Sequence, residues 1–230
     1  GNTLNFSFSY NKNFGPRDGL ETGGMVYDLF ANNAKVYIAT SNGLFTYKMG
    51  MLLDHFTTSD GLPSNTILDL DMDSKGTLWL ATAKGLSQYT GLGFKNYSRK
   101  DGLPSSLVTA VHVDNADDSR IWTGSKSSGL TRFDKKGFFT FAVQDGLPSN
   151  QIQDITQLDN GDLVIACYKA GVATYNGKRF QLFDNGLDDK RVISIAIGPD
   201  RGIWAGTESA GIGVLEGTSF RMIRDTDGLG

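Results

Sequence analysis

The chain has 230 residues and a formal net charge of −3, from 22 basic and 25 acidic residues. This length suits one large domain or two small ones, and a near balance of charge without a basic run argues against a nucleic-acid partner. No stretch approaches the ~18 consecutive apolar residues of a spanning helix, so we expect no membrane contact from this segment. The single cysteine, Cys167, excludes an internal disulfide and a cysteine-built zinc site.

Glycine is abundant, with 29 residues, because a short phrase recurs along the chain. The phrase is Asp-Gly-Leu, in one copy Asp-Asn-Gly-Leu, and its glycines are Gly19, Gly61, Gly102, Gly146, Gly186 and Gly228. A period of about 40 residues is typical of repeat architectures. We therefore predict one domain over residues 1–230, with repeats at about 19–60, 61–101, 102–145, 146–185 and 186–228.

Each repeat contains four short runs of β-branched and aromatic residues, which we call strands a, b, c and d. In the second repeat they begin near Ile67, Leu78, Gly85 and Phe94. Runs of this length without helical periodicity predict an all-β protein, a β-propeller of four-stranded antiparallel blades with five blade repeats in this chain. Residues 1–18 add a further outer strand, near residues 8–14, which we expect to pair at the edge of the fifth blade and close the ring.

Three copies of the phrase continue with proline and serine: Asp-Gly-Leu-Pro-Ser begins at Asp60, Asp101 and Asp145. A run similar to Leu78-Trp79-Leu80-Ala81-Thr82 follows each copy. In these features the chain resembles the two-component regulator propeller repeat, over nearly its whole length. The resemblance implies an extracytoplasmic sensor propeller of a bacterial hybrid two-component receptor, in the periplasm or outside the cell, and a ligand that is an oligosaccharide or another small molecule.

The chain departs from that family in the number of blades. Five sets of inner strands are present, where the family usually has seven blades in a ring. Part of a seven-bladed ring is therefore the alternative to a closed five-bladed one. The family also implies a protein partner in signalling and a homodimer of the full-length receptor. A secreted interaction scaffold without a kinase is the alternative function.

The repeated residues have structural explanations. In the phrase, Asp can bond backbone N–H groups, Gly allows a positive φ and Pro presets φ for a turn. Trp79, Trp122 and Trp204 occupy one position of strand b, as a residue packed between blades would. A second column, on strand a, holds Asp28, Asp69, Ala110, Asp154 and Ser194.

Strand a lines the centre of a propeller, so the carboxylates of Asp28, Asp69 and Asp154 are expected to converge there. They are weak candidates for a cation such as calcium, and capping of neighbouring backbone is the alternative that we favour. We expect no metal and no cofactor.

An enzymatic role finds little support in the residues, although related propellers include lyases that cleave cyclic peptide antibiotics. The two histidines, His55 and His112, fall on strand d and at the end of strand a, so they are predicted to be separate and solvated. No nucleophile motif or phosphate loop is present. We therefore expect a non-enzymatic protein.

Candidate ligand-binding residues lie where the repeats stop resembling one another. The d-to-a and b-to-c connections share one face of a propeller because successive strands alternate in direction. Variation at matched positions is what a single asymmetric site on a near-symmetric ring requires. The predicted ligand-binding residues on this face are Lys84, Lys126, Tyr168, Lys169, Arg191 and Glu208.

Overall fold

The computed structural model describes residues 24–33 and 35–223. Over these residues the chain forms five antiparallel sheets of four strands each, and the strands of every sheet are paired in chain order. The described part contains no α-helix. The prediction of an all-β chain made of four-stranded blades is confirmed, and each sheet lies within one predicted repeat.

The blades are numbered 1 to 5 along the chain. Blade 1 holds β1 (Val26–Asn32), β2 (Lys35–Thr40), β3 (Gly43–Lys48) and β4 (Met51–Phe56). Blade 2 holds β5 (Ile67–Met72), β6 (Leu78–Thr82), β7 (Gly85–Tyr89) and β8 (Phe94–Tyr97). Blade 3 holds β9 (Val108–Val113), β10 (Ile121–Ser125), β11 (Leu130–Asp134) and β12 (Gly137–Phe141). Blade 4 holds β13 (Ile152–Gln157), β14 (Leu163–Cys167), β15 (Gly171–Tyr175) and β16 (Phe180–Phe183). Blade 5 holds β17 (Val192–Ile197), β18 (Ile203–Thr207), β19 (Ile212–Glu216) and β20 (Ser219–Ile223).

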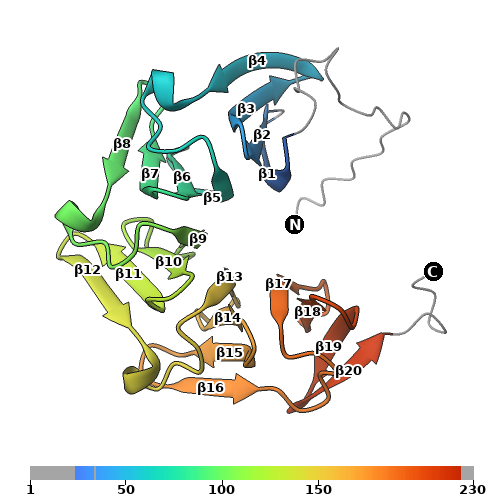
Figure 1. Ribbon diagram of the computed structural model, residues 1–230. Coiled ribbons are helices and arrows are strands. Elements are labelled where there is room, and N and C mark those ends of the chain that lie inside the picture. Colours follow the sequence, from blue (N-terminus) through green and yellow to red (C-terminus); the bar gives the residue numbers. More distant parts are fainter. Residues whose placement is uncertain (1–23, 34, 224–230) are drawn as a thin grey trace.

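The five blades stand in an arc around a central space (Figure 1). Strands β1, β5, β9, β13 and β17 lie innermost, and β4, β8, β12, β16 and β20 lie at the rim. Blades 1 and 5, at the two ends of the arc, do not lie side by side. The outer strand predicted near residues 8–14, with its pairing to blade 5, lies outside the described residues.

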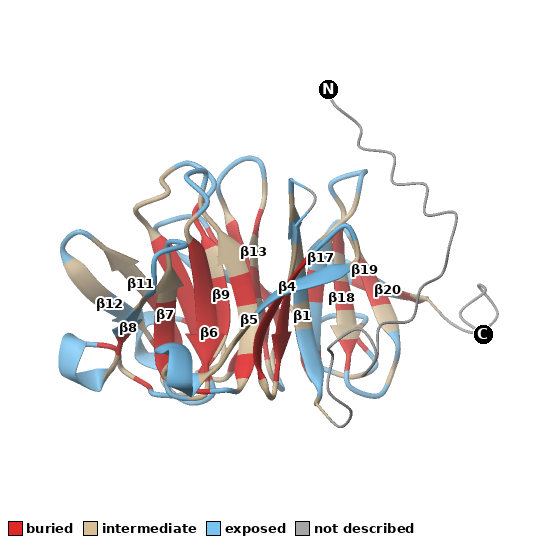
Figure 2. Cartoon of the chain, turned by 90° about the horizontal axis from the view of Figure 1, so that it is seen from above, coloured by how far each residue is buried: buried red, intermediate tan, exposed pale blue. Residues whose placement is uncertain are grey.

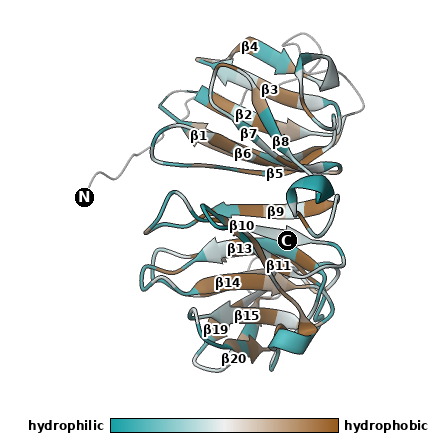
Figure 3. Cartoon of the chain, turned by 90° about the vertical axis from the view of Figure 1, so that its left-hand side faces the viewer, coloured by the Kyte–Doolittle hydropathy of each residue, from teal (hydrophilic) through white to brown (hydrophobic). Residues whose placement is uncertain are grey.

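Apolar clusters lie between successive blades because each strand alternates its side chains between the two faces of its sheet. Between blades 3 and 4, Trp122 and Leu130 pack with Ile152 and Ile155 of the next inner strand. Buried residues follow the middle of the blades and the connections are exposed (Figure 2). Figure 3 shows the same division by hydropathy, with hydrophobic strands and hydrophilic turns. Blade-to-blade packing is therefore the core of this protein.

The strand-b aromatic position behaves as predicted only inside the arc. Trp79 and Trp122 are buried, and Trp79 packs against Tyr97 and Phe133 with ring centroids 6.0 and 5.9 Å away. Trp204 is only partly buried. The expectation that every blade buries this residue between neighbours is wrong for blade 5, where no described blade packs over Trp204, and Tyr37 of blade 1 is also only partly buried.

The repeated phrase forms a capped turn in the three copies that begin at Asp60, Asp101 and Asp145. In each copy the carboxylate accepts a hydrogen bond from the backbone N–H three residues earlier, as Asp101 does from Ser98 at 2.8 Å. The following glycine is left-handed, with φ of 105° at Gly61, 102° at Gly102 and 92° at Gly146. The structural interpretation of the phrase is confirmed, because these residues terminate short 3₁₀ helices at Thr58–Asp60, Arg99–Asp101 and Val143–Asp145.

Candidate functional site

The d-to-a and b-to-c connections meet on one face of the arc, here called the loop face. In blade 2 the Ala83 amide donates to the carbonyl of Thr66. Blades 4 and 5 repeat this bond, from Tyr168 to Gln151 and from Glu208 to Arg191. The shared face predicted from strand direction is therefore confirmed.

Arg191 is the centre of a polar cluster on the loop face of blades 4 and 5. Its guanidinium donates twice to the Asp189 carboxylate, both at 2.9 Å, and once to Ser209 Oγ at 2.7 Å. Its remaining terminal nitrogen pairs with Glu208 at 2.5 Å. A guanidinium held by a bidentate partner keeps a fixed orientation, which suits it to recognise planar or paired oxygen groups.

Tyr168 joins this cluster from the b-to-c connection of blade 4. Its hydroxyl donates to Glu208 Oε2 at 3.1 Å, and the Lys169 ammonium lies 5.7 Å from the centre of its ring. Lys169 has a φ of 64°, in the left-handed region that few residues other than glycine adopt. Four of the six predicted ligand-binding residues, Tyr168, Lys169, Arg191 and Glu208, are thus brought together by the fold.

The charges of the cluster compensate one another. Hydrogen bonds from the Arg191 side chain and backbone, and from Ser209, hold the pKa of Asp189 well below its ordinary range. Partial burial raises the pKa of the Tyr168 phenol, and its hydrogen bond to Glu208 adds to the rise. At neutral pH the surface therefore presents ionised Arg191 and Asp189 beside a neutral phenol.

The other two predicted residues stand apart from this cluster. Lys84 and Lys126 are exposed on the b-to-c connections of blades 2 and 3. Among the residues that the structure describes, neither ammonium forms an ion pair or joins the hydrogen bonds around Arg191. Their place in a ligand site stays a prediction.

Asp189 is the residue that the sequence analysis missed. It occupies the place of Ser64, Ser105 and Ser149 in the repeated phrase, and like them it accepts the backbone N–H two residues later. The carboxylate can also bind the Arg191 side chain, which the serine hydroxyl cannot do in this bidentate way. The signal was visible in the sequence, because Asp188-Asp189 stands here where three other copies of the phrase have Pro-Ser.

The aspartates of the strand-a column bridge neighbouring blades. Asp28 accepts the backbone N–H of Leu70 at 3.2 Å, Asp69 that of Val111 at 2.7 Å and Asp154 that of Ile195 at 2.8 Å. Where the column holds Ala110, the adjacent Thr109 hydroxyl donates to the Ile152 carbonyl instead, at 2.5 Å. The capping role of the column is confirmed, and it acts between blades.

The carboxylates converge closely enough to affect one another. Burial raises the pKa of Asp69 well above its ordinary value, and the charges of Asp28 and Asp154 raise it further. Burial also raises the pKa of Asp154. Within the described residues, however, no group of three or more His, Cys, Asp or Glu side chains is arranged to hold a metal ion.

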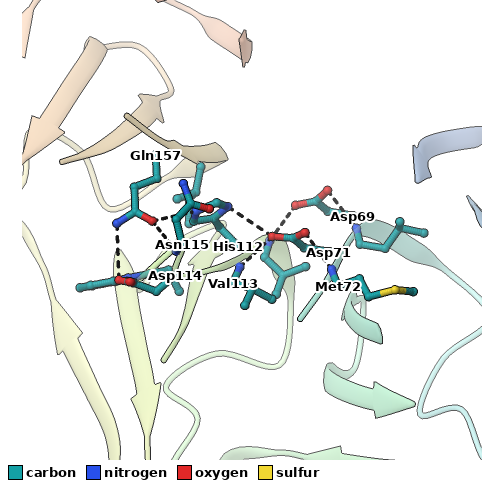
Figure 4. Close-up of polar contacts among 12 residues, drawn as sticks. Asp69, Asp71, Met72, His112, Val113, Asp114, Asn115 and Gln157 are labelled. Carbon is teal, nitrogen blue, oxygen red and sulfur yellow. Dashed lines mark hydrogen bonds and ion pairs between the residues drawn. The ribbon is translucent and has the colours of Figure 1, made fainter. Parts of the chain in front are cut away.

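A polar hollow of about 360 Å³ opens beside this column, at the end of the inner strands opposite the loop face. His112 lies in its wall, with Nδ1 3.3 Å from Asp71 Oδ2 and Nε2 3.4 Å from Gln157 Oε1 (Figure 4). The Gln157 amide oxygen also accepts the backbone N–H of Asn115 at 2.7 Å. The lining contains no hydroxyl or thiol side chain that would serve as a nucleophile.

The expectation that both histidines are solvated is wrong. The His112 side chain is only 13% exposed, since it is held between blades 2 and 4 by Asp71 and Gln157. His55 stacks on Phe45 with a centroid distance of 3.9 Å, and its Nε2 lies 2.8 Å from the Asn42 carbonyl oxygen. Their predicted separation holds, because His55 lies on β4 and His112 on β9.

Cys167 is buried at the end of β14, and burial raises the pKa of its thiol to about 12. A thiol in this state is a packing group and a poor nucleophile at neutral pH. The described residues also include no helix of the length and apolarity required to cross a bilayer.

Comparison with known proteins agrees with this architecture. The family model described as "Two component regulator propeller" matches residues 61–84, which run from the phrase at Gly61 through β5 and β6. None of the curated proteins matches the sequence.

Among solved structures, the extracellular domain of the hybrid two component system BT4673 of B. thetaiotaomicron has 21% identity and a TM-score of 0.69, and the match covers 82% of this chain and 27% of that one. The corresponding domain of BT3049 has 19% identity and a TM-score of 0.61, with 91% and 35% covered. Virginiamycin B lyase from Staphylococcus aureus, in an inactive form with quinupristin, has 15% identity and a TM-score of 0.72, with 89% and 72% covered. The chain thus spans about a third or less of the two sensor chains.

At these identities the solved structures establish the fold. This chain is a β-propeller, and its residues 61–84 match the two component regulator propeller repeat.

Proposed function

We propose that this chain is a non-enzymatic recognition module of a bacterial two-component sensor, located in the periplasm or outside the cell, which binds an oligosaccharide on the loop face of blades 4 and 5. The sensor role is supported by the repeat and by the likeness to extracellular domains of two-component systems. The site is supported by one observation, the Arg191 cluster, in which three connections from two blades converge on one oriented guanidinium.

A hydroxyl-rich, uncharged ligand suits this cluster better than an anion. Arg191 already lies beside two carboxylates, Asp189 and Glu208, so an added anion would meet their negative charge. Vicinal hydroxyls both donate and accept, and they can therefore satisfy the carboxylates and the guanidinium together. The partly exposed Tyr168 ring offers an apolar surface for a sugar ring.

The proposal is tested by measuring the thermal stability of the protein with neutral and with acidic oligosaccharides. We expect a neutral oligosaccharide to raise the melting temperature, because a ligand that binds only the folded state stabilises it. The ligand-induced rise should be lost in Arg191→Ala and in Tyr168→Ala. Arg179→Ala is a matched control, since Arg179 is an exposed arginine in the c-to-d turn of the same blade 4.

The same measurement separates the other locations on the loop face. A rise that survives Arg191→Ala but disappears in Lys84→Ala or Lys126→Ala would place the site over blades 2 and 3. A rise with acidic oligosaccharides alone would contradict the preference for uncharged ligands. If no oligosaccharide stabilises the protein, the oligosaccharide assignment fails.

Binding of a protein partner and homodimerisation of the full-length receptor belong to the same proposal. A secreted scaffold would bind its protein partner without any small ligand, and pull-down with and without a stabilising oligosaccharide distinguishes the two roles. A lyase would open a cyclic lactone in the presence of a divalent metal, and we expect no turnover in that assay.

A further inference from the structure

His112 connects three successive blades at the end of the inner strands opposite the loop face. It lies on β9 of blade 3, between Asp71 on β5 of blade 2 and Gln157 on β13 of blade 4 (Figure 4). Its Nδ1 is 3.3 Å from Asp71 Oδ2, and its Nε2 is 3.4 Å from Gln157 Oε1. All three residues belong to the middle of the arc, away from its two ends. We call these three side chains the histidine bridge.

The amide of Gln157 presents its oxygen to the ring. That oxygen also accepts the backbone N–H of Asn115 at 2.7 Å, and the amide nitrogen donates to the carbonyl of Gly161 at 2.8 Å. A flipped amide would set donor against donor at Asn115 and acceptor against acceptor at Gly161, so this orientation is fixed by its neighbours. Nε2 of His112 must therefore carry a hydrogen to bind Gln157.

The carboxylate of Asp71 is an acceptor as well. Its Oδ1 accepts the backbone N–H of Met72 and its Oδ2 accepts that of Val113, both at 2.7 Å. An ionised carboxylate has no hydrogen to donate, so Nδ1 of His112 must also carry one to bind Asp71. A neutral imidazole has one N–H group and an imidazolium has two. The histidine bridge is thus complete only when His112 is protonated.

Carboxyl groups surround the polar hollow beside His112. They come from every element packed around the ring, and they are Asp69, Asp71, Asp114, Asp118 and Asp154. No lysine or arginine is among the described residues that line the hollow. Arg120 pairs with Asp114 at 3.2 Å and offsets that one charge. Burial raises the pKa of Asp154, and the charge of His112 counteracts part of the rise. A positive charge on His112 therefore meets no basic side chain in this lining.

We propose that His112 is a pH-sensitive contact, which joins blades 2, 3 and 4 when its ring is protonated and releases one of its two partners when the ring is neutral. Histidine titrates between about pH 5 and 8, so the histidine bridge is complete in mildly acidic solution and loses one hydrogen bond toward pH 8. The stabilisation that it contributes is therefore present at the acidic end and is lost as the pH rises. The histidine bridge lies opposite the loop face, so this inference does not rest on the oligosaccharide site.

Nitrogen-15 NMR of the imidazole rings tests the protonation state. The chain has two histidines, so His55→Gln leaves His112 as the only imidazole, and circular dichroism checks that this variant keeps its β structure. Both ring nitrogens of His112 should carry a hydrogen at pH 5, and only one should carry a hydrogen at pH 8. A ring that is neutral at pH 5, or that has the same state at both pH values, would overturn the proposal.

Urea unfolding tests whether the proton stabilises the arc. His112→Gln can donate to one partner but carries no charge, so it should lower the urea midpoint more at pH 5 than at pH 8. Asp69 is present in both chains, and its own pH dependence therefore drops out of the comparison. In the Asp71→Asn background, which lacks the charged partner, His112→Gln should have nearly the same effect at the two pH values.

Three results of the unfolding experiment would contradict the histidine bridge. Equal losses at pH 5 and pH 8 would show that His112 is only a packing residue. A larger loss at pH 8 would reverse the sign of the effect. A pH dependence that persists with Asp71→Asn would assign the proton to a partner other than Asp71.

Discussion

Two opposing effects act on the ionisation of the Asp69 carboxyl group. Its carboxylate accepts the amides of Leu70 and Val111, which favours the ionised form, but burial and the nearby charges of Asp28 and Asp154 disfavour it more strongly. The inner strands therefore gain contact between blades at an electrostatic cost. That cost depends on pH because it exists only while Asp69 is ionised.

We expect Asp69 to make the protein less stable as the pH rises. The folded pKa lies above the ordinary value of 3.8, so between these two values the folded state holds a proton that the unfolded chain has released. Its stabilising contribution is complete below pH 3.8 and is lost as the pH rises through the folded pKa. Urea unfolding of Asp69→Asn from pH 4 upward should show a smaller decline than the unchanged chain, and a steeper decline would contradict the assignment.

A glycine pair tests the packing between blades at single-residue scale. Gly124→Ala would place a Cβ atom 2.6 Å from Ile152 and 3.2 Å from Ala110, so it should destabilise the protein by about 1–3 kcal/mol through overpacking. Gly206→Ala meets only the movable Ser194 side chain and should cost less. Equal losses in chemical denaturation would show that the Ile152 contact is not the cause.

Among the elements, the three 3₁₀ turns differ in the side chain at the N-cap. Thr57 and Ser98 begin their turns with a side-chain cap, whereas Ala142 has almost the same φ and ψ and no hydroxyl. Ala142→Ser should therefore stabilise the protein by about 0.5–1 kcal/mol, because the hydroxyl can accept a free amide of the turn. Ser98→Ala should change the free energy of unfolding in the opposite direction, and a loss in both variants would refute the capping argument.

Strand order and turn positions were predictable at the element scale because residue spacing carries them. The register shift inside strand a was not predictable from the sequence. Every inner strand has a register shift one or two residues before the column, as between Ile67 and Asp69 in β5. A bulge of this kind turns the aspartate toward the next blade, and it depends on pairing with strand b, which a single run of residues does not reveal.

At the scale of the whole molecule, we expect a packing residue at the end of the arc to contribute less to the free energy of unfolding than one inside it. Trp79→Ala should cost roughly 3–5 kcal/mol, because it leaves a cavity beside Tyr97 and Phe133. Trp204→Ala should cost less, because Trp204 is only partly buried whereas Trp79 is buried. Thermal or urea unfolding measures both. A larger loss for Trp204 would contradict the link between burial of this residue and stability.

The candidate site shows how much of a binding site can be predicted by comparing equivalent positions of the repeats. Tyr168, Lys169, Arg191 and Glu208 were selected because they vary where the repeats otherwise agree, and the fold joins them through Asp189 and Ser209. Lys84 and Lys126 satisfy the same rule and do not join them. Variation marks which positions are free to differ, but it carries no information about which of them touch.

The sequence by itself determined the repeat, the four strands of each blade, the capped turns and the face on which the variable connections lie, because these depend on contacts within one repeat of about 40 residues. The tertiary structure decided which loop residues meet, how the aspartate column joins the blades, and which neighbouring groups hold the two histidines. These properties depend on the angle and distance between successive blades. A repeat of about 40 residues constrains which side chains meet where two blades join. The packing of the whole arc decides how the successive blades are placed relative to one another.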